Sequence, residues 1–202
     1  MKLHVLPLSP NSRKVLMVNA LTGLNLPVEA VDVAAKAHKT HAFLKLNPNG
    51  LLPVLDLDDG TSLWESNAIA CRLAALAKSE LWPASDLRYD IMRWQFWEGC
   101  HWTPACAPFA SKHLFGNDGV DIAAATEKFH LRARVLDDHL AGHDWLVGEA
   151  MTLADICVAM VLYLRGPCHY PVDGYANILR WVESIEALEA FKAMGGMPQA
   201  AE

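Results

Sequence analysis

The segments Leu51-Leu52-Pro53-Val54-Leu55 and Trp64-Glu65-Ser66-Asn67-Ala68-Ile69 decide the fold of this chain. The first predicts an extended strand that opens on a proline, and the second predicts a strand that ends where a helix begins. Between them Asp58-Asp59-Gly60 is a turn sequence, so residues 53–57 and 61–64 are expected to form a β-hairpin. The apolar residues that follow recur at helical spacing, which predicts a helix after the hairpin.

A strand–helix–strand unit is predicted ahead of the hairpin. Residues 3–8 form a short apolar run, and Ser9-Pro10-Asn11-Ser12 carries the residue types that start helices. Gly23 then supplies a helix stop, and residues 27–33 form a second strand-like run. Two strands joined by a helix predict a parallel βαβ unit with a right-handed crossover. The order βαβ and then ββα is that of a thioredoxin-like domain.

The expected fold class is α/β followed by all-α. We expect the thioredoxin-like domain over 1–78, a linker over 79–85 and a helical bundle over 86–202. Within the first domain, residues 34–50 are predicted to be polar and irregular. The helices expected in the second domain are 86–103, kinked or ended by Pro104 and Pro108, then 121–140, a helix that opens at Thr152-Leu153-Ala154-Asp155, and 177–194.

Composition excludes several classes of protein. The 202 residues carry a formal charge of −6 without a run of Lys or Arg, which argues against nucleic acid and an anionic membrane surface as partners. No apolar stretch reaches the roughly 18–20 residues of a membrane helix, and the start of the chain lacks the layout of a signal peptide. The five cysteines are widely spaced without a CxxC motif, as is typical of a reducing compartment. A cytoplasmic globular protein is therefore expected.

The motifs above, together with the segment Asn177–Trp181, resemble those of the cytosolic glutathione S-transferase family in its bacterial, serine- or theta-like type. The resemblance covers nearly the whole chain. It implies glutathione as co-substrate, no metal, a homodimer and a role in detoxification. The reaction that it implies is attack of the glutathione thiolate on a small, apolar electrophile, held in a pocket that the helical domain lines.

Four residues in the two opening segments are expected to bind glutathione under this resemblance. The bond between Leu52 and Pro53 is expected to be cis, which would turn the Leu52 main chain outward to pair with the ligand like an added strand. Glu65 is expected to take the α-amino group of the γ-glutamyl end, and Ser66 its α-carboxylate. The alternatives are that Pro53 merely lacks a ladder partner and that Ser66 is an ordinary N-cap.

Three residues of the N-terminal turn are candidates for activating the thiol. Ser9 matches the hydroxyl of serine-type transferases, Asn11 is the second candidate donor and Ser12 the third. Plain helix capping by Ser9 or Ser12 is the alternative, and we expect Ser9 to serve both roles, as cap and as donor. A thiol with a pKa of about 8.5 is mostly protonated at neutral pH, and lowering that pKa by two units corresponds to roughly 2.7 kcal/mol. A charge-assisted hydrogen bond and a helix N-terminus can supply this free energy. No cysteine precedes Cys71, so a cysteine nucleophile at this turn is excluded.

His38 and Lys39 lie where many members of the family contact the glycine carboxylate of glutathione. The alternative is a solvated polar loop. The chain departs from the family nearby, because many relatives have a lysine just before the Val-Pro pair and this chain has Leu51 and Leu52. His38 or Lys39 must then compensate, or glutathione binds more weakly.

The first long helix of the second domain carries the candidates for the co-substrate pocket. In the family this helix lines the site of the electrophile, and an indole- and imidazole-rich wall would suit flat, apolar substrates. The alternative is that the same side chains form the core of the bundle. The candidates are Trp97, His101, Trp102 and Cys106.

Two other patterns in this domain are assigned to folding. His139 and His143 could suggest a metal site, but Gly142 interrupts the helix between them, so we expect histidines that stabilise a helix C-terminus. The segment from Thr152 to Asp155 is a capping-box sequence before an apolar run.

Two other functions stay open. One is a different glutathione-dependent enzyme on the same scaffold: a dehalogenase, isomerase, peroxidase or disulfide-bond reductase. The other is a non-catalytic binding protein, which the missing lysine before Leu52 favours. The joint presence of Ser9, Glu65 and Ser66 favours the transferase.

Overall fold

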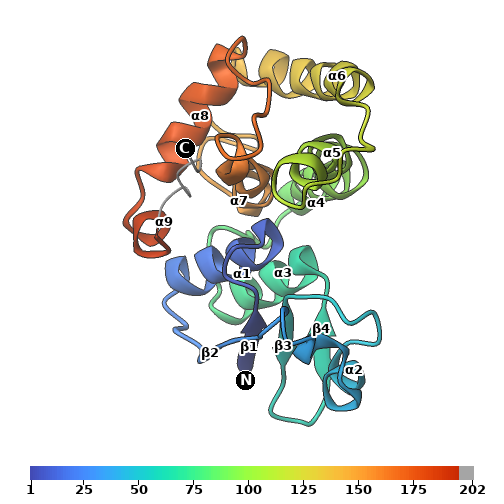
Figure 1. Ribbon diagram of the computed structural model, residues 1–202. Helices are drawn as coiled ribbons and strands as arrows, with labels where there is room; N and C mark the ends of the chain where they lie inside the picture. The colour runs from blue at the N-terminus through green and yellow to red at the C-terminus, as the bar shows by residue number, and fades with distance from the viewer. Residues whose placement is uncertain (196–202) are drawn as a thin grey trace. The chain divides into compact units, whose positions relative to one another are not determined.

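The computed structural model describes residues 1–195, and the chain divides into two compact units between Pro83 and Ala84 (Figure 1). The division falls inside the segment 79–85, and the exact domain bounds given above stay a prediction. Each unit is described by itself below. In the part of the chain that the structure describes, no helix is both long and apolar enough to cross a membrane.

The first unit is built as predicted, with βαβ followed by ββα. A four-stranded sheet has the order β2-β1-β3-β4, in which β1 and β2 are parallel and the other neighbours are antiparallel. The hairpin is the one expected from Asp58-Asp59-Gly60. The elements are β1 (Lys2–Val5), α1 (Pro10–Leu21), β2 (Val28–Ala30), β3 (Val54–Asp56), β4 (Ser62–Trp64) and α3 (Ser66–Leu76).

The two faces of this sheet differ in what covers them. Leu3 and Val5 on β1 are fully buried, while His4 between them points to the other face, because successive side chains of a strand alternate. There the His4 ring meets Phe43 edge-on, with centroids 6.2 Å apart. Val31, Phe43 and Val54 form a small apolar cluster on that face. The helices α1 and α3 pack against one another and lie side by side in Figure 1.

The prediction that residues 34–50 are irregular is wrong. They contain a 3₁₀ turn, η1 (Ala37–Lys39), and a short helix, α2 (His41–Leu46). Thr40 caps α2 by accepting a hydrogen bond from the Phe43 N–H. Phe43 is the one residue of α2 that is buried, so this helix has too little apolar periodicity to be read from the sequence.

In the second unit, the regular structure up to residue 195 is helical. The prediction of a helix over 121–140 is confirmed, since Asp121 caps it by accepting from the Ala124 N–H at 3.0 Å. The predicted stretch 177–194 is two helices, which are separated at Ala187 and Leu188. The elements are α4 (Leu87–Trp97), α5 (Thr103–His113), α6 (Ile122–Leu140), α7 (Leu153–Ala159), the 3₁₀ segment η3 (Met160–Leu164), α8 (Ala176–Glu186) and α9 (Glu189–Ala193).

The prediction that the first long helix could end at Pro104 or Pro108 is wrong, because the helix continues past both prolines. A π-helical segment, η2 (Glu98–Trp102), joins α4 directly to α5. Pro104 falls in the first turn of α5, where a missing N–H is tolerated. Pro108 lies inside α5, which continues past it to His113.

The capping box at the start of α7 is confirmed and is tied into the core of the unit. Thr152 and Asp155 exchange hydrogen bonds between side chain and backbone. The Asp155 carboxylate also accepts from the Leu146 N–H at 2.8 Å and from the Trp181 indole N–H at 3.0 Å. Burial raises the pKa of Asp155, and these hydrogen bonds oppose that rise. One buried carboxylate thus joins α7, α8 and the segment before α7.

Candidate active site

Ser9 occupies the N-cap position of α1, but its side chain does not cap the helix. Its backbone is extended, with φ −77° and ψ 128°, and Pro10 opens the helix after it. The half-buried hydroxyl makes no hydrogen bond with any residue between 1 and 195. The expectation that Ser9 also caps the helix is therefore wrong, and its hydroxyl is available to a ligand.

Ser12 has a structural role. It is fully buried, and its hydroxyl oxygen accepts from the Leu6 N–H at 3.0 Å. This bond fastens the chain just after β1 to the first turn of α1. Because Ser12 is fully buried, its hydroxyl is out of reach of a ligand thiol, which speaks against it as the thiol donor.

Asn11 connects α1 with α3. Its Oδ1 accepts a hydrogen bond from the Ser66 hydroxyl at 3.4 Å. One helical turn further along, the Lys14 ammonium donates to Asn67 Oδ1, also at 3.4 Å. The N-terminal turns of the two helices are thus held next to one another, and both present positive dipole ends and backbone N–H groups to one region.

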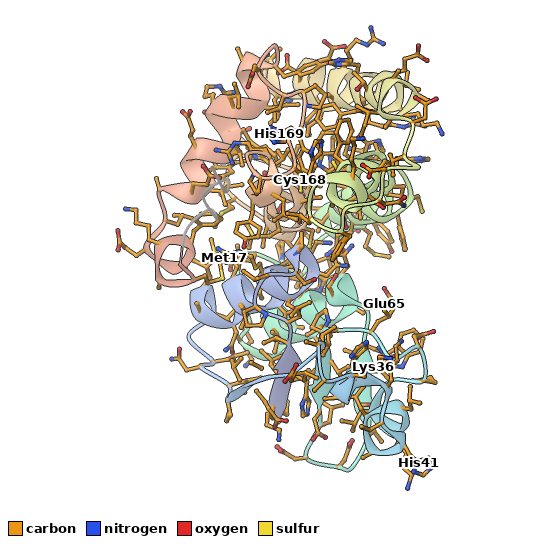
Figure 2. The ribbon with its side chains drawn as sticks, in the orientation of Figure 1. Met17, Lys36, His41, Glu65, Cys168 and His169 are labelled. Carbon is orange, nitrogen blue, oxygen red and sulfur yellow. The ribbon has the colours of Figure 1, made fainter. Side chains whose placement is uncertain are left out.

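The alternative that Ser66 is the N-cap of α3 is wrong, because Ser66 is the first residue of the helix. Glu65 holds the cap position with a positive φ of +73° and makes no side-chain cap hydrogen bond. Ser66 is buried, whereas Glu65 is exposed at the start of α3 (Figure 2). A hydroxyl at the helix start and a carboxylate beside it can bind the two charges of an amino-acid end group.

The peptide bond between Leu52 and Pro53 is cis, as expected. Pro53 is buried, and Leu52 packs against the cluster of Val31, Phe43 and Val54. The main chain of Leu52 makes no hydrogen bond within residues 1–195. It is therefore able to pair with an extended ligand.

Lys39 holds the turn that precedes Leu52. Its ammonium donates to the Gly50 carbonyl at 2.9 Å and to the Asn49 carbonyl at 3.3 Å. Gly50 has φ +59°, a left-handed conformation that favours glycine, and a Cβ there would lie 3.0 Å from the His38 carbonyl oxygen. His38 lies beside it with a buried Nδ1 that has no hydrogen-bond partner among the described residues. The structure thus brings η1 to the turn before the cis peptide.

Sequence reasoning missed Lys14 and Asn67 as neighbours of this site. Lys14 is 1% exposed, and Arg13 next to it is also buried. Cations close to a helix N-terminus oppose the helix dipole, so the pair Arg13-Lys14 near the start of α1 was a readable signal for an anion nearby. Asn67 carried no such signal.

The four co-substrate candidates do not share one environment. Trp102 and Cys106 are fully buried, and Trp102 packs on Phe129 in the core of the unit. Burial holds the pKa of the Cys106 thiol well above its usual range. Trp97 is half-buried and stacks on Trp102, whereas His101 is exposed. Trp102 and Cys106 are therefore placed as core residues, as the alternative had it.

Trp97 does line a pocket of about 380 Å³ within the second unit. Trp94 meets the Trp97 ring edge-on at 5.1 Å and the His139 ring at 4.9 Å. Arg93 and Val135 complete the lining. The walls of this pocket are aromatic and apolar, with one guanidinium at the side.

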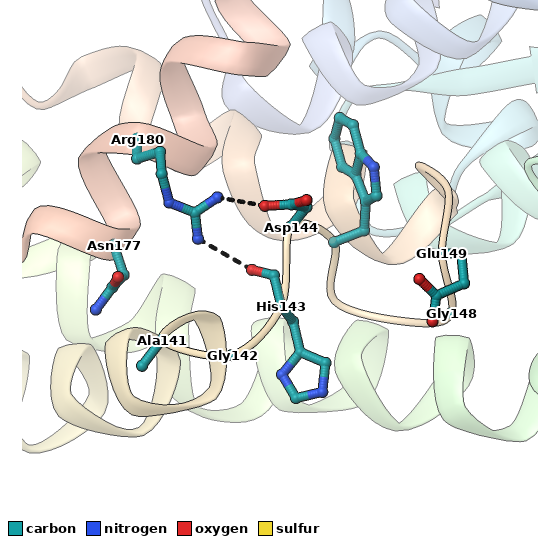
Figure 3. A pocket seen from close by; sticks show the side chains of 9 residues that line it. Ala141, Gly142, His143, Asp144, Gly148, Glu149, Asn177 and Arg180 are labelled. Atoms are coloured by element: carbon teal, nitrogen blue, oxygen red, sulfur yellow. Dashed lines mark hydrogen bonds and ion pairs between the residues drawn. The ribbon is translucent and has the colours of Figure 1, made fainter.

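A separate polar pocket of about 410 Å³ lies between the end of α6 and the start of α8 (Figure 3). Arg180 crosses it, pairing with the Asp144 carboxylate at 2.8 Å and donating to the carbonyls of Leu140 and His143. These contacts join α8 to the C-terminal end of α6. We assign this pocket to the folding of the helical unit.

The two histidines near the end of α6 are held by backbone carbonyls. His139 Nε2 lies 3.0 Å from the Leu146 oxygen, and His143 Nδ1 lies 2.7 Å from the His139 oxygen. Their rings stack with centroids 4.6 Å apart. Among the described residues no group of three or more His, Cys, Asp or Glu is arranged to hold a metal ion.

Comparison with known proteins finds one family over most of the chain. Residues 8–76 match the glutathione S-transferase N-terminal domain, and residues 99–189 match the glutathione S-transferase C-terminal domain. Glutathione S-transferase 3 of Zea mays is 35% identical over 211 residues, which cover 98% of this chain and 95% of that protein. The crystal structure of a glutathione S-transferase from Pseudomonas fluorescens has a TM-score of 0.85 at 30% identity, covering 94% of this chain and 96% of that one.

Elongation factor 1-gamma of Artemia salina is also similar. It is 30% identical over 203 residues, which cover 96% of this chain but 46% of that protein. The matched region therefore makes up less than half of that protein, which is not named as a transferase.

Proposed function

We propose that this chain, which belongs to the glutathione S-transferase family, is an enzyme that activates the thiol of glutathione and transfers it to a small electrophile. The observation that carries the proposal is the hydrogen bond between Asn11 and Ser66. It joins two helix N-termini, so a thiolate and a carboxylate of one ligand can each meet a positive dipole end.

Ser9 is the proposed thiol donor. Its hydroxyl is half-buried and unused, and it stands at the N-terminus of the twelve-residue helix α1. Donation to a thiolate sulfur stabilises the charged form, which lowers the thiol pKa. Asn11 is the proposed second donor: because its Oδ1 faces the Ser66 hydroxyl, its amide N–H groups point elsewhere. The buried ammonium of Lys14 adds positive charge nearby.

The other proposed contacts are made along the glutathione molecule, from its γ-glutamyl end to its glycine carboxylate. Ser66 and the first N–H groups of α3 hold the γ-glutamyl carboxylate, and Glu65 takes the α-amino group. The free main chain of Leu52, before Pro53, pairs with the cysteinyl residue. Lys39 or His38 meets the glycine carboxylate, and Lys39 does so while still holding the turn at Gly50.

The second unit supplies the surroundings of the electrophile in this proposal. Trp97 and His101 remain the candidates, because Trp102 and Cys106 are used by the core. Binding places the thiolate next to the electrophilic carbon, and this positioning carries much of the rate. We further propose that the protein is a cytoplasmic homodimer with a role in detoxification.

A non-catalytic role is the second candidate. The similarity to elongation factor 1-gamma of Artemia salina over 96% of this chain is the observation that favours it. Such a protein would keep the fold and could keep glutathione binding, but it would leave the thiol pKa unchanged.

A pH titration of bound glutathione separates the two functions. The purified protein is saturated with glutathione, and the thiolate is followed by its ultraviolet absorbance. We expect a thiol pKa well below about 8.5, the usual value for a free thiol. Absent binding, or binding with an unshifted thiol, would contradict the transferase and favour the binding protein.

A further inference from the structure

Two histidines of the second unit have their rings in contact although they are distant in the chain. His113 is the last residue of α5, and His169 lies in the turn between η3 and α8, next to Cys168 (Figure 2). Their ring centroids are 4.7 Å apart, and the ring planes are inclined at 64°. Within residues 1–195 neither ring makes a hydrogen bond. Neither residue is a candidate for binding glutathione or the electrophile.

The backbone of His169 is held in an uncommon conformation. Its φ is +53°, in the left-handed region that few residues other than glycine adopt. Cys168 and Tyr170 on either side are buried, and the Tyr170 N–H donates to the Arg165 carbonyl at 3.0 Å, so the turn is well anchored. The imidazole between them is exposed. Unfavourable backbone conformations that the surrounding structure maintains are frequent at ligand sites, and this one keeps one imidazole beside another.

The other histidine pair of this unit, His139 and His143, shows what distinguishes this arrangement. Its centroids are equally close, but its rings are stacked with an interplanar angle of 6°. One nitrogen of each ring also lies within hydrogen-bond distance of a backbone carbonyl. The lone pair of an imidazole nitrogen lies in the ring plane, so two stacked, parallel rings cannot direct their lone pairs to one point. Rings inclined at 64° can do so, and their nitrogens are free for it.

We propose that His113 and His169 together bind a divalent transition-metal ion through one ring nitrogen each. Neutral imidazole is a good ligand for Ni²⁺, Cu²⁺ and Zn²⁺. With metal–nitrogen bonds of about 2.0–2.1 Å, two imidazoles on one ion have ring centroids roughly 4.5–5.2 Å apart. The 4.7 Å between these rings falls within that range. Water completes the coordination, since no group of three or more His, Cys, Asp or Glu within residues 1–195 is placed to hold an ion. The proposal is independent of the glutathione chemistry.

The electrostatic surroundings of the pair are mixed. His113 ends α5, and the C-terminal end of a helix carries partial negative charge, which favours a cation. Desolvation lowers the pKa of His113, and the charges of His169 and Lys112 lower it further. This imidazole is therefore neutral at neutral pH, as a metal ligand must be. The Lys112 ammonium opposes a second cation nearby, so Lys112→Gln should tighten metal binding.

Ni²⁺ is a suitable probe because imidazole nitrogen binds it well and it does not oxidise thiols. The full chain, without a polyhistidine tag, is titrated with nickel chloride at neutral pH by isothermal titration calorimetry. We expect one saturable site per chain. Hydrated Ni²⁺ is paramagnetic and broadens nearby NMR signals, so the backbone amides of Leu114 and His169 should broaden first. The amide of Gly142, next to the stacked pair, should keep its width.

His113→Gln and His169→Asn should each weaken Ni²⁺ binding by roughly tenfold or more, because chelation by two linked ligands is lost. Asparagine tolerates the left-handed backbone, so the turn is kept, and circular dichroism checks the fold. The double variant should bind little more weakly than either single variant. His143→Gln, in the stacked pair, is the matched control and should bind Ni²⁺ normally. Binding that does not saturate, that survives both single variants, that is lost in His143→Gln, or that falls additively in the double variant would overturn the proposal.

Discussion

At the scale of single residues, the proposed chemistry depends on which hydrogen-bonding groups the fold leaves unused. Ser9 and Ser12 are three positions apart with the same side chain, yet only Ser12 has its hydroxyl engaged, by the Leu6 N–H. Ser12 is also fully buried, whereas Ser9 is half-buried, so only the Ser9 hydroxyl can reach a ligand. Burial thus separates two serines that the sequence presents as similar.

Replacing Ser9 by alanine should raise the pKa of bound glutathione thiol and reduce kcat/KM by roughly 10- to 150-fold. The reason is the loss of one hydrogen bond to a charged group, worth about 1.5–3 kcal/mol. Glutathione affinity should change little, because its other contacts remain. Thiolate absorbance and steady-state kinetics measure both effects, with Ser85→Ala as a control at an exposed serine.

If Ser9→Ala kept both the low thiol pKa and full turnover, the donor would be elsewhere. Asn11 would then be tested in the Ser9→Ala background.

Asn11→Ala and Ser66→Ala should not act independently. Each removes one end of the same hydrogen bond, so the double variant should lose less glutathione affinity than the sum of the single losses. We expect a coupling energy on the order of 0.5–3 kcal/mol in a double-mutant cycle measured by calorimetry. Strict additivity would show that the two helix N-termini bind the ligand separately.

The limits of sequence reasoning are visible at this scale. The cis peptide before Pro53 follows from a local motif, and the structure confirms it. The binding roles of Glu65 and Ser66 also come from local motifs and stay predictions. The contact of Asn11 with Ser66 could not be read, because it joins residues 55 positions apart and depends on how α1 packs on α3. The exact use of a hydroxyl, as at Ser12, depends likewise on a backbone group in another element.

At the scale of elements, α6 shows that burial can outweigh a helix dipole. A histidine near a helix C-terminus is expected to be stabilised in its charged form. Burial is nevertheless the main cause that lowers the pKa of His139, and the charges of His143 and Arg93 lower it further, while the hydrogen bond to the Leu146 oxygen opposes this. His139 is thus better described as a neutral packing residue against Trp94.

The pH dependence of stability should follow from this lowered pKa. The unfolded chain binds a proton at His139 more readily than the folded chain, so stability is full above about pH 6.5 and falls as pH drops through the lower folded-state pKa. Urea unfolding between pH 7 and pH 5 should show this decline. His139→Gln should reduce it, and His41→Gln, at an exposed histidine, should not. An unchanged decline in His139→Gln would contradict the assignment.

The start of a helix could be predicted where the sequence contains capping residues. Asp121 caps α6, and Thr152 with Asp155 caps α7, and the predicted starts of both helices are confirmed. The short helix α2 was missed because it depends on one buried side chain, Phe43. The path of α4 into α5 was missed because prolines usually interrupt a helix, and nothing in the sequence marks a π-helical segment.

At the scale of the whole molecule, two helices of the second unit present apolar residues to solvent. Tyr89 and Phe96 on α4 are 73% and 64% exposed, and Leu131 and Val135 on α6 are 50% and 46% exposed. Large exposed apolar side chains are candidates for an interface. The pocket that Arg93 and Val135 share joins the two helices at this surface. We propose this surface as the contact between two copies of the chain.

Phe96→Glu should convert a dimer into a monomer, because a charge would be buried without a partner at the contact. Light scattering of the purified protein measures the mass, and circular dichroism checks that the helices remain. Phe115→Glu is the matched control, since Phe115 is 80% exposed but lies in the segment after α5. A monomeric wild type, or a variant that stays dimeric, would refute this surface as the contact.

The π-helical segment Glu98–Trp102 sets which side chains of α5 face the core. An extra residue in one turn advances all that follows by about 100° around the axis. Deleting Gly99 would restore the ordinary α-helical repeat in this turn. Cys106 and Phe109 would then rotate out of the core, and other side chains of α5 would take their place. A single codon therefore sets the angular alignment of the two halves of this helix. An insertion or deletion at this position would therefore rotate the whole surface of α5, although no residue of α5 would be changed.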